Sequence, residues 1–304
     1  MSDAPHGRLL LRLTARCNSR CAHCGIADLA GMPDRAAADA VAELRAARAR
    51  GCDEVVFLRG EATLRNDLAV IANAARTMGY KLIQVQTNGG ALADDAVLAR
   101  LMAAGVNFFE VSFFGHVAPL HDAVDGTTGA FARVTAALIN LARRRCAVLV
   151  TVPVVRRNYV ALSMIAARLA QLGVRRVQFN LPRPVRVDDA WNTAALVPLG
   201  EASPFIRAAI REARALGMRA EAEAVPFCHL DESMRDGLDA AESFARHAVS
   251  DLHRREDSME EHRRASRPRA PQCAACDLVE RCPTTWAAAQ DLYGTASLVP
   301  IRRR

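Results

Sequence analysis

The chain has 304 residues, 51% of them apolar, and a formal net charge of +7. No apolar run approaches the roughly 20 residues that a membrane span requires, and the N-terminus lacks a basic segment followed by an apolar one, so neither a transmembrane protein nor a signal peptide is expected. Nine cysteines favour metal ligation in a reducing compartment over a disulfide framework. We therefore expect a soluble, cytoplasmic protein whose length suits an α/β barrel with a small appendage.

The first predicted element is a buried strand, Leu9–Leu13, and a cysteine-rich loop follows it directly. Cys17, Cys21 and Cys24 lie in the run Cys-Asn-Ser-Arg-Cys-Ala-His-Cys. Three thiolates from one loop can hold three irons of a [4Fe-4S] cluster and leave the fourth iron open to a small molecule. Zinc sites and redox thiols also use clustered cysteines, so the spacing alone leaves these alternatives open.

Helical and strand patterns then alternate along the chain. The strand candidates after the first are Glu54–Leu58, Leu82–Gln86, Phe108–Phe113, Ala147–Pro153 and Arg176–Asn180. The helical stretches are Arg35–Arg50, Asn66–Met78, Ala93–Ala103, Phe131–Arg144 and Tyr159–Leu172, with Gly51, Gly79, Gly105 and Gly173 as helix stops. Six strand-helix repeats predict a parallel sheet. A count below eight favours a partial barrel, although periodicity alone does not exclude an open doubly wound sheet.

Polar residues follow several of these strands, at the end where active sites collect in βα-barrels. Gly60 permits close backbone approach to a ligand after the second strand, and Glu61 beside it can bind an ammonium group. Thr87 and Asn88 form a polar turn that can face the same rim, or can serve only as a strand-to-helix turn.

Each polar residue considered after the third strand can have either a structural or a functional role. Asn158 is either a helix N-cap or a ligand contact, and His121 is more typical of a structural histidine than of a catalytic one. Arg156 and Arg183 can clamp a carboxylate through bidentate hydrogen bonds, or lie in solvent.

The pattern changes toward the C-terminus. A mixed-charge, helix-favouring stretch, Asp251–Arg267, leads into Pro268–Pro271 and then Cys273, Cys276 and Cys282, which indicates a small metal-stapled module. Two other cysteines, Cys52 and Cys146, fit buried hydrophobic positions better than ligand positions.

The N-terminal cysteine run resembles the signature of the radical S-adenosylmethionine (SAM) enzymes. In that family the SAM amine and carboxylate chelate the open iron, and the reduced cluster cleaves the sulfonium. His23 stands where the family often has an aromatic residue, and we do not expect it to be a ligand. Arg59-Gly60-Glu61-Ala62 resembles the Gly-Gly-Glu-Pro motif that holds the SAM amine, with Arg59 and Ala62 replacing its first Gly and its Pro.

This resemblance implies a partial (β/α)6 TIM-like barrel over residues 1–217, with a core from about residue 8. It also implies a set of SAM-binding positions at the ends of the strands, with Ser112 near the ribose. The positions are Gly60, Glu61, Thr87, Asn88, Ser112 and Asn158.

The distal cysteine run resembles the auxiliary-cluster region of twitch and SPASM-type radical SAM enzymes, which implies a second [4Fe-4S] cluster in a domain over residues 218–304. A closed site needs a fourth thiolate, and Cys228 is the best candidate beside Cys273, Cys276 and Cys282. A four-thiolate zinc site from the same sulfurs is the alternative. The loop from His121 to Phe131 resembles a stretch of family members that carry additional clusters.

The resemblance implies an enzyme that cleaves SAM to a 5′-deoxyadenosyl radical and abstracts a substrate hydrogen, supplied with electrons by a flavodoxin- or ferredoxin-type donor. Because the cluster loop begins by Cys17, no N-terminal peptide-recognition domain is expected. This favours dehydrogenation, epimerisation or cross-linking of a small molecule or short peptide in natural-product biosynthesis. A peptide (RiPP) maturase that uses a separate leader-binding partner is the alternative.

A second class of function is a non-enzymatic zinc or iron–sulfur protein that binds nucleic acid, as the positive charge and the distal cysteines would allow. The arginines are spread along amphipathic helical segments, which favours a solvated surface. They form neither an aromatic-interleaved patch nor a recognised nucleic-acid motif, so this alternative is disfavoured.

Overall fold

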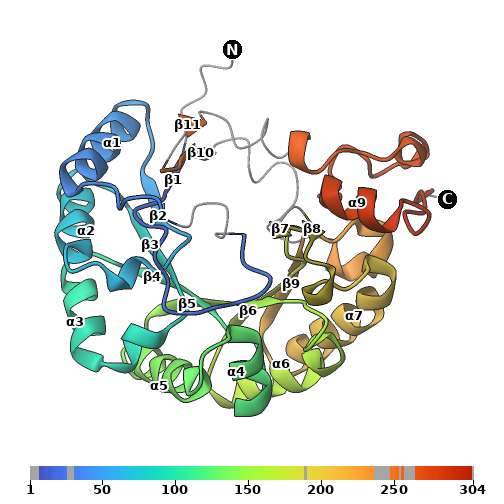
Figure 1. Cartoon of the computed structure of the whole chain (residues 1–304), viewed down its shortest axis with the longest axis horizontal. Coiled ribbons are helices and arrows are strands. Elements are labelled where there is room, and N and C mark those ends of the chain that lie inside the picture. The colour runs from blue at the N-terminus through green and yellow to red at the C-terminus, as the bar shows by residue number, and fades with distance from the viewer. Residues whose placement is uncertain are drawn as a thin grey trace.

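The computed structural model describes residues 7–25, 31–187, 190–235, 247–252, 255–256 and 264–302. In this part of the chain a curved sheet is covered on its outer side by a crescent of helices (Figure 1). Its strand order is β11-β10-β1-β2-β3-β4-β5-β6-β9. All neighbouring strands are parallel except β10 and β11, which are antiparallel. The sheet is not closed, which confirms a partial TIM-like barrel rather than a doubly wound sheet.

The strands of this sheet are β1 (Arg8–Leu11), β2 (Glu54–Phe57), β3 (Leu82–Thr87), β4 (Phe108–Ser112), β5 (Ala147–Pro153), β6 (Arg176–Asn180), β9 (Arg219–Glu223), β10 (His247–Ser250) and β11 (Arg255–Glu256). A separate hairpin consists of β7 (Arg186–Val187) and β8 (Ala190–Trp191). The α-helices are α1 (Ala37–Ala49), α2 (Leu68–Thr77), α3 (Asp95–Ala103), α4 (Ala118–Asp125), α5 (Ala130–Arg143), α6 (Leu162–Gln171), α7 (Leu199–Ala215) and α9 (Ala287–Tyr293). No helix in the described ranges is long and apolar enough to cross a bilayer.

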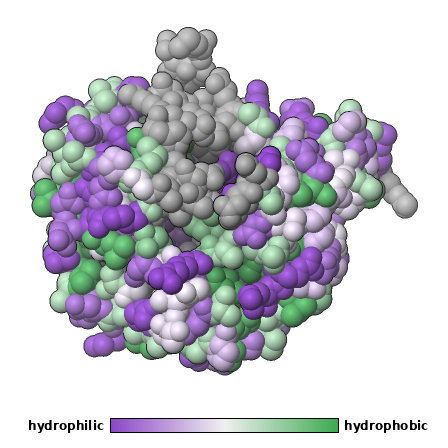
Figure 2. Space-filling model, in the orientation of Figure 1, coloured by the Kyte–Doolittle hydropathy of each residue, from purple (hydrophilic) through white to green (hydrophobic). Residues whose placement is uncertain are grey.

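The six predicted strands and the five predicted helices are all present, with ends within three residues of the predicted ones. The agreement has a simple reason. Successive residues of a strand point to opposite faces of the sheet, and the residues that point to the helices are apolar and form the core. Leu9, Leu11, Val85, Phe109 and Val152 belong to this set and are fully buried. The face drawn in Figure 2 mixes hydrophilic and hydrophobic residues, as expected for arginines spread over the surface.

The sheet has two more parallel strands than the six that the sequence predicts. Both β9 and β10 come from residues after 217, the part assigned to a second domain, and they lie at opposite edges of the parallel array. The helix-favouring interpretation of Asp251–Arg267 is wrong at Arg255–Glu256, which forms β11, while residues 253–254 and 257–263 lie outside the described ranges. The sheet is therefore built from both halves of the chain.

The strand residues that face away from the helices form a polar cluster on the concave side of the sheet. Glu110 accepts hydrogen bonds from Gln84 Nε2 at 2.6 Å, Gln86 Nε2 at 2.9 Å and Thr151 Oγ1 at 2.9 Å. Burial raises the pKa of Glu110 above its ordinary value of 4.5. The polar cluster therefore has at its centre a carboxyl group that releases its proton at higher pH than a glutamic acid in water does.

Replacing Glu110 by Gln keeps an acceptor oxygen but removes the ionisation. As pH rises from 4.5, the unfolded chain releases the Glu110 proton before the folded chain does, so this residue lowers the free energy of unfolding with rising pH. We expect the decline between pH 4.5 and 8, measured by urea denaturation, to be shallower in Glu110→Gln. Glu280→Gln is the control, because Glu280 is exposed and its pKa is lowered by Arg269, so its ionisation does not lower the free energy of unfolding as pH rises. Equal slopes for Glu110→Gln and the wild type would contradict the assignment.

Candidate functional site

The structure brings the predicted cofactor-binding positions to one rim of the sheet. The cysteine loop follows β1, Glu61 follows β2, Thr87 ends β3 and Ser112 ends β4. Because the strands are parallel, these carboxyl ends meet at the same edge. We call residues Cys17–Cys24 the cluster loop.

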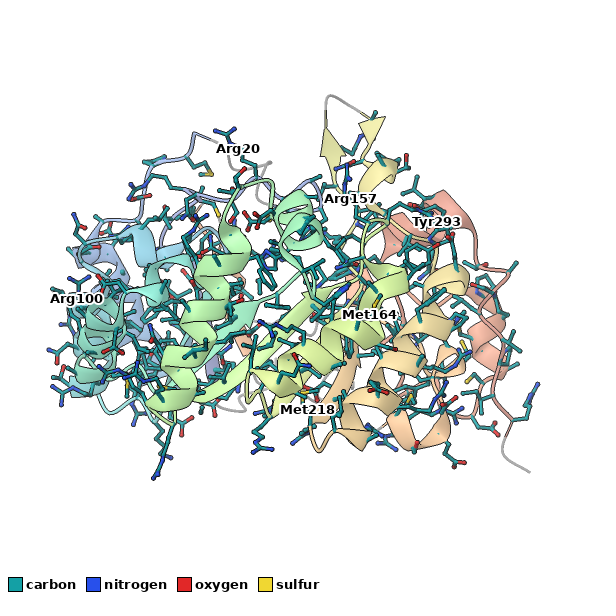
Figure 3. The ribbon with its side chains drawn as sticks, turned by 90° about the horizontal axis from the view of Figure 1, so that it is seen from below. Arg20, Arg100, Arg157, Met164, Met218 and Tyr293 are labelled. Atoms are coloured by element: carbon teal, nitrogen blue, oxygen red, sulfur yellow. The ribbon has the colours of Figure 1, made fainter. Side chains whose placement is uncertain are left out.

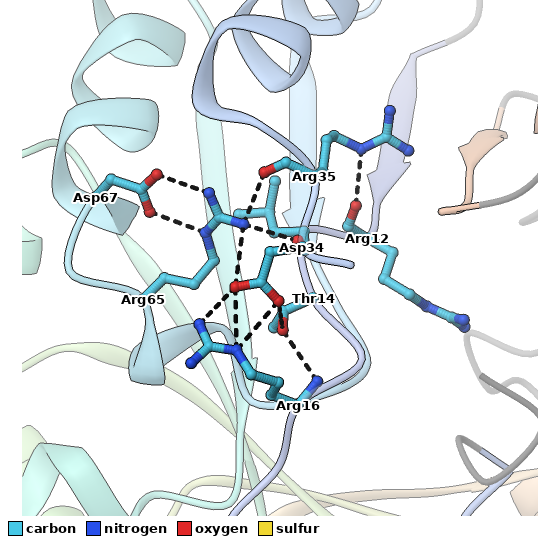
Figure 4. A network of polar contacts seen from close by, with 8 residues as sticks. Arg12, Thr14, Arg16, Asp34, Arg35, Arg65 and Asp67 are labelled. Atoms are coloured by element: carbon cyan, nitrogen blue, oxygen red, sulfur yellow. Dashed lines mark hydrogen bonds and ion pairs between the residues drawn. The ribbon is translucent and has the colours of Figure 1, made fainter. Parts of the chain in front are cut away.

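An ionic network fixes the chain where it enters the cluster loop (Figure 4). Thr14 Oγ1 donates to Asp34 Oδ1 at 2.5 Å, and Arg16 Nε donates to both Asp34 carboxylate oxygens at 3.2 and 3.1 Å. The Arg16 side chain is 58% exposed, so its ion pair stabilises the loop only slightly. The Thr14 contact is better shielded, since Thr14 is fully buried.

Arg65 supplies the buried part of the same network. Its Nη1 donates to the carbonyl oxygens of Leu13 at 2.9 Å and Arg35 at 2.8 Å, and Nε and Nη2 form a bidentate pair with Asp67 at 2.9 and 2.7 Å. Arg65 is buried, so losing it would take a donor from both carbonyls, although Leu13 O also accepts from Arg35 N at 2.9 Å. The start of the cluster loop is thereby joined to the segments before α1 and α2.

The C-terminus of α4 supports the opposite side of the cluster loop. Asp125 accepts from Arg20 N through its backbone oxygen at 2.8 Å and from Ser19 Oγ through Oδ2 at 2.8 Å. The Sγ atom of Cys21 lies 3.5 Å from the same backbone oxygen. A side chain at Gly126 would lie 2.6 Å from the Arg20 oxygen, so only glycine permits this approach. The sequence did not assign Asp125 a role.

Asn88 joins the third strand to the cluster loop. Its Nδ2 donates to Asn18 Oδ1 at 2.7 Å and to Ser19 Oγ at 2.9 Å, and its Oδ1 accepts from Gly90 N. The predicted Thr-Asn-Gly turn therefore contacts the cluster loop itself.

The three thiols of the cluster loop lie close enough to affect one another. Burial raises the pKa of Cys21, and the charges of Asp125, Cys24 and Cys17 raise it further. Ser19 N donates to Cys17 Sγ at 3.4 Å, and Cys24 N bonds to Cys21 O at 3.0 Å, which closes a turn between two of the cysteines. This arrangement suits three thiols presented from one loop at the rim.

His23 fills the aromatic position beside the third cysteine. Its ring packs edge-on against Phe114, with centroids 5.5 Å apart, and burial lowers its pKa to about 4. His121 is buried among Phe113, Phe114 and Phe131, and its pKa is likewise lowered to about 4 by burial. Both rings are neutral packing elements at neutral pH, as expected for His121.

Glu61 is turned into the protein rather than toward a ligand. Its Oε1 accepts from Thr63 Oγ1 at 2.5 Å and Thr87 Oγ1 at 2.8 Å, and its Oε2 accepts from Asn88 N at 2.7 Å. The residue is 1% exposed, and burial raises its pKa. The carboxyl group thus joins the ends of β2 and β3, which differs from the expected contact with an ammonium group.

The backbone before Glu61 makes the closest approach to the cluster loop. Gly60 has φ 64°, and a Cβ there would lie 2.3 Å from Thr14 O and 3.1 Å from Arg16 O. Arg59, at the position of the family's first Gly, is also left-handed, with φ 57°. Its guanidinium extends toward Gly25, beside Cys24.

Asn158 braces two strand ends. Its Oδ1 accepts from Val155 N at 2.9 Å, and its Nδ2 donates to Phe114 O at 3.0 Å and Pro153 O at 2.9 Å. The side chain is fully buried and makes no capping hydrogen bond to the following 3-10 turn, so the predicted N-cap role is wrong, while the predicted ligand contact stays a prediction. The sequence could not show these backbone partners.

Of the two predicted arginine clamps, Arg156 makes its contacts within the protein. Arg156 Nη1 pairs with Glu201 Oε1 at 2.5 Å and Nε donates to Leu196 O at 3.2 Å, so its donors are used within the protein. Arg183 is half-buried in the connection between β6 and β7.

The four distal cysteines lie together, as predicted. Cys228, Cys273, Cys276 and Cys282 line one pocket whose other walls are mostly apolar. The remaining lining residues are Pro226, Phe227, Pro268, Ala270, Val279, Thr284, Leu298, Val299 and Pro300. Backbone N–H groups reach two of the sulfurs, from Phe227 to Cys282 at 3.5 Å and from Ile301 to Cys276 at 3.4 Å. Burial raises the pKa of Cys228 to about 11.

The two cysteines left out of both sets behave as hydrophobic residues. Cys52 is fully buried in the core, and Cys146 Sγ lies 3.6 Å from Met102 Sδ. Among the described residues, no three His, Cys, Asp or Glu side chains gather as a single metal ion would require.

Gly60 provides a stability test of the close approach. We expect Gly60→Ala to lower the free energy of unfolding by at least about 2 kcal/mol, because the new Cβ meets a backbone oxygen as well as an unfavourable φ. Gly217→Ala is the matched control, with φ 78° and nothing within 4 Å, and should cost about 1 kcal/mol. Equal losses in urea denaturation would show that the contact with Thr14 is not limiting.

Known proteins resemble both the sequence and the fold. Residues 11–160 match the Radical SAM superfamily. The chain is 32% identical over 141 residues to the AdoMet-dependent heme synthase of Methanosarcina barkeri, covering 45% of this chain and 39% of that protein. It is 29% identical over 191 residues to the mycofactocin maturase MftC of Mycobacterium tuberculosis, covering 60% of this chain and 46% of that protein. The chain thus spans less than half the length of either relative.

Two solved structures share the fold across nearly the whole chain. Native anSMEcpe with bound AdoMet superposes with a TM-score of 0.68 at 14% identity, over 96% of this chain and 93% of that one. Streptococcus suis SuiB bound to S-adenosylmethionine gives a TM-score of 0.67 at 14% identity, over 97% of this chain and 76% of that one. The sequence match and the shared fold lead to one conclusion, that this protein carries a radical SAM domain.

Proposed function

We propose that the protein is a radical SAM enzyme that abstracts a hydrogen atom from a peptide substrate. The observation that carries this proposal is the cluster loop, whose three cysteines stand at the carboxyl ends of the strands and within the matched domain. Cys17, Cys21 and Cys24 would hold three irons of a [4Fe-4S] cluster, and the donor set fits a cluster with one open iron. A cluster there supplies the electron that splits SAM into methionine and a 5′-deoxyadenosyl radical.

The protein's own contribution is to hold the loop and the cofactor in fixed positions. Arg65 and Asp125 hold the start and the middle of the loop, so the backbone that carries the thiols is restrained before metal binds. Gly60 lets the backbone approach the methionine end of SAM, while Thr87, Asn88 and Ser112 line the adjoining rim. In this arrangement Glu61 and Asn158 act by bracing the strand ends rather than by direct contact.

We further propose that Cys228, Cys273, Cys276 and Cys282 hold an auxiliary [4Fe-4S] cluster, as in twitch or SPASM-type regions. Four thiols on apolar walls fit a closed cluster, and backbone N–H groups directed at the sulfurs stabilise their thiolate form. A closed cluster has no position for SAM, so it would either accept the substrate electron, the role that we favour, or brace the mouth of the barrel. A flavodoxin- or ferredoxin-type donor would reduce the first cluster.

The two sequence relatives described above divide between a synthase named for heme and a maturase, and the shared fold with SuiB supports the choice of a peptide as substrate. One sequence relative is named a maturase, and SuiB has been solved bound to its precursor peptide SuiA, with 97% of this chain covered by the shared fold.

Removing any cysteine of the cluster loop tests the first proposal. After anaerobic reconstitution, we expect Cys17→Ala, Cys21→Ala and Cys24→Ala to abolish 5′-deoxyadenosine formation from SAM, because two thiolates cannot hold the cluster with one open iron. Cys146→Ala, outside both cysteine sets, should retain formation. Product measured by chromatography in all three variants would refute the assignment, as would zinc without SAM cleavage in the wild type.

Replacing Cys276 tests the second cluster. The wild type should bind about eight irons, and Cys276→Ala about four, with some SAM cleavage retained because the first cluster is intact. Iron and sulfide analysis, with the same assay for 5′-deoxyadenosine, checks both statements. Two complete clusters in Cys276→Ala would show that the four-cysteine assignment is wrong.

A further inference from the structure

A cavity of about 270 Å³ lies between the connection from β6 to α7 and the C-terminal helix α9. Its walls are formed by apolar and aromatic side chains and by three prolines. The lining residues that define it are Pro182, Pro184, Pro198, Leu196, Trp286 and Tyr293. Within α9, Ala289 faces the cavity together with Trp286 and Tyr293, three and four residues away on one side of the helix. None of the proposed cluster ligands lines it.

The cavity opens on the same rim as the cluster loop. Val154 and Leu181, which directly follow β5 and β6, form part of its wall, and so does Gly200 in the first turn of α7. Figure 3 shows Arg20 of the cluster loop, Arg157 and Tyr293 along one edge of the molecule and Met218 at the opposite edge. Leu298 lines both this cavity and the distal cysteine pocket, so the two spaces are neighbours.

The walls are fixed by contacts outside the cavity. Trp286 Nε1 donates to Leu181 O at 2.7 Å, and the Arg267 guanidinium lies 4.0 Å above the Trp286 ring. Arg267 in turn donates to Glu223 Oε1 at 3.2 Å. Together with the prolines, these contacts make a preformed space, whereas well-packed interiors leave few voids larger than a water molecule.

A polar group stands near the cavity. Arg156 and Tyr159 both bond to Glu201 Oε1, at 2.5 and 2.6 Å, and the charges of Arg156 and Glu201 act on Tyr293. An apolar pocket next to a few polar groups is typical of a site that takes an apolar group from a ligand whose remainder stays hydrated. A volume below about 300 Å³ suits one side chain rather than a whole drug-sized molecule.

We infer that this cavity anchors an aromatic side chain of the peptide substrate. Trp286 and Tyr293 offer ring faces and edges, and aromatic pairs are stabilised beyond the simple burial of their surface. The inference rests on the proposed function and names the substrate class more closely, as a peptide with an aromatic residue held beside the distal cysteine pocket.

The test uses the reconstituted holoenzyme and N-acetyl-L-tryptophanamide, a capped aromatic residue, as the probe. Saturation-transfer NMR should detect saturable binding of this probe to the wild type and none of N-acetyl-L-alaninamide. Ala289→Phe fills the cavity and should weaken probe binding at least tenfold. Ala288→Phe is the matched control, since it makes the same change on the same helix at a residue that does not line the cavity, and it should bind the probe as the wild type does.

Tyr293→Ala provides a second variant that removes a wall without adding bulk, and it should weaken binding severalfold. Absence of binding to the wild type, or equal weakening in Ala288→Phe and Ala289→Phe, would overturn the inference. The outcome is separable from the proposed function: probe binding without SAM cleavage would leave the cavity assigned and the catalytic proposal refuted. SAM cleavage without probe binding would do the reverse.

Discussion

The candidate site depends on hydrogen bonds that restrain the irregular cluster loop at two places. The cluster loop has no regular hydrogen-bond ladder, so its position comes from side chains elsewhere in the chain. Arg65 holds its entrance through buried carbonyls, and Asp125 holds its middle through backbone and hydroxyl contacts. Glu61 then connects the neighbouring strand ends, so the rim behaves as one piece. This framework fixes the backbone of the segment that carries the three thiols.

Much of the fold could be predicted from the sequence because hydrophobic periodicity reports which face of each element is buried. The strands β2 to β6 carry β-branched or aromatic residues and β1 carries three leucines, and the ends of all six were predicted within two residues. By contrast, β9 reads Arg-Ala-Glu-Ala-Glu and β10 only His-Ala-Val-Ser, with little intrinsic preference for a strand. Their pairing with β6 and β1 supplies what their composition lacks, and such long-range pairing is not visible in a local pattern.

In the candidate site too, features set by neighbouring residues could be predicted from the sequence, whereas contacts between distant residues could not. Residue type and strand ends sufficed to place Gly60, Thr87 and Asn88 on one rim and to gather the four distal cysteines. Roles that depend on distant partners were mistaken or missed. Asn158 has the composition of a cap or ligand, yet its bonds go to the backbone of Phe114 and Pro153. Asp125 lies about a hundred residues from the loop that it supports, so no sequence motif reports it.

The stacking of Arg267 on Trp286 affects how the C-terminal segment can move. Through Glu223 and the Leu181 carbonyl, this pair fastens the C-terminal segment to β9 and β6, the last two strands of an unclosed sheet. A sheet with a free border can flex at that border more easily than a sealed cylinder can. Any flexing there carries the distal cysteine pocket with it, so the spacing between that pocket and the cluster loop follows the bending of the sheet.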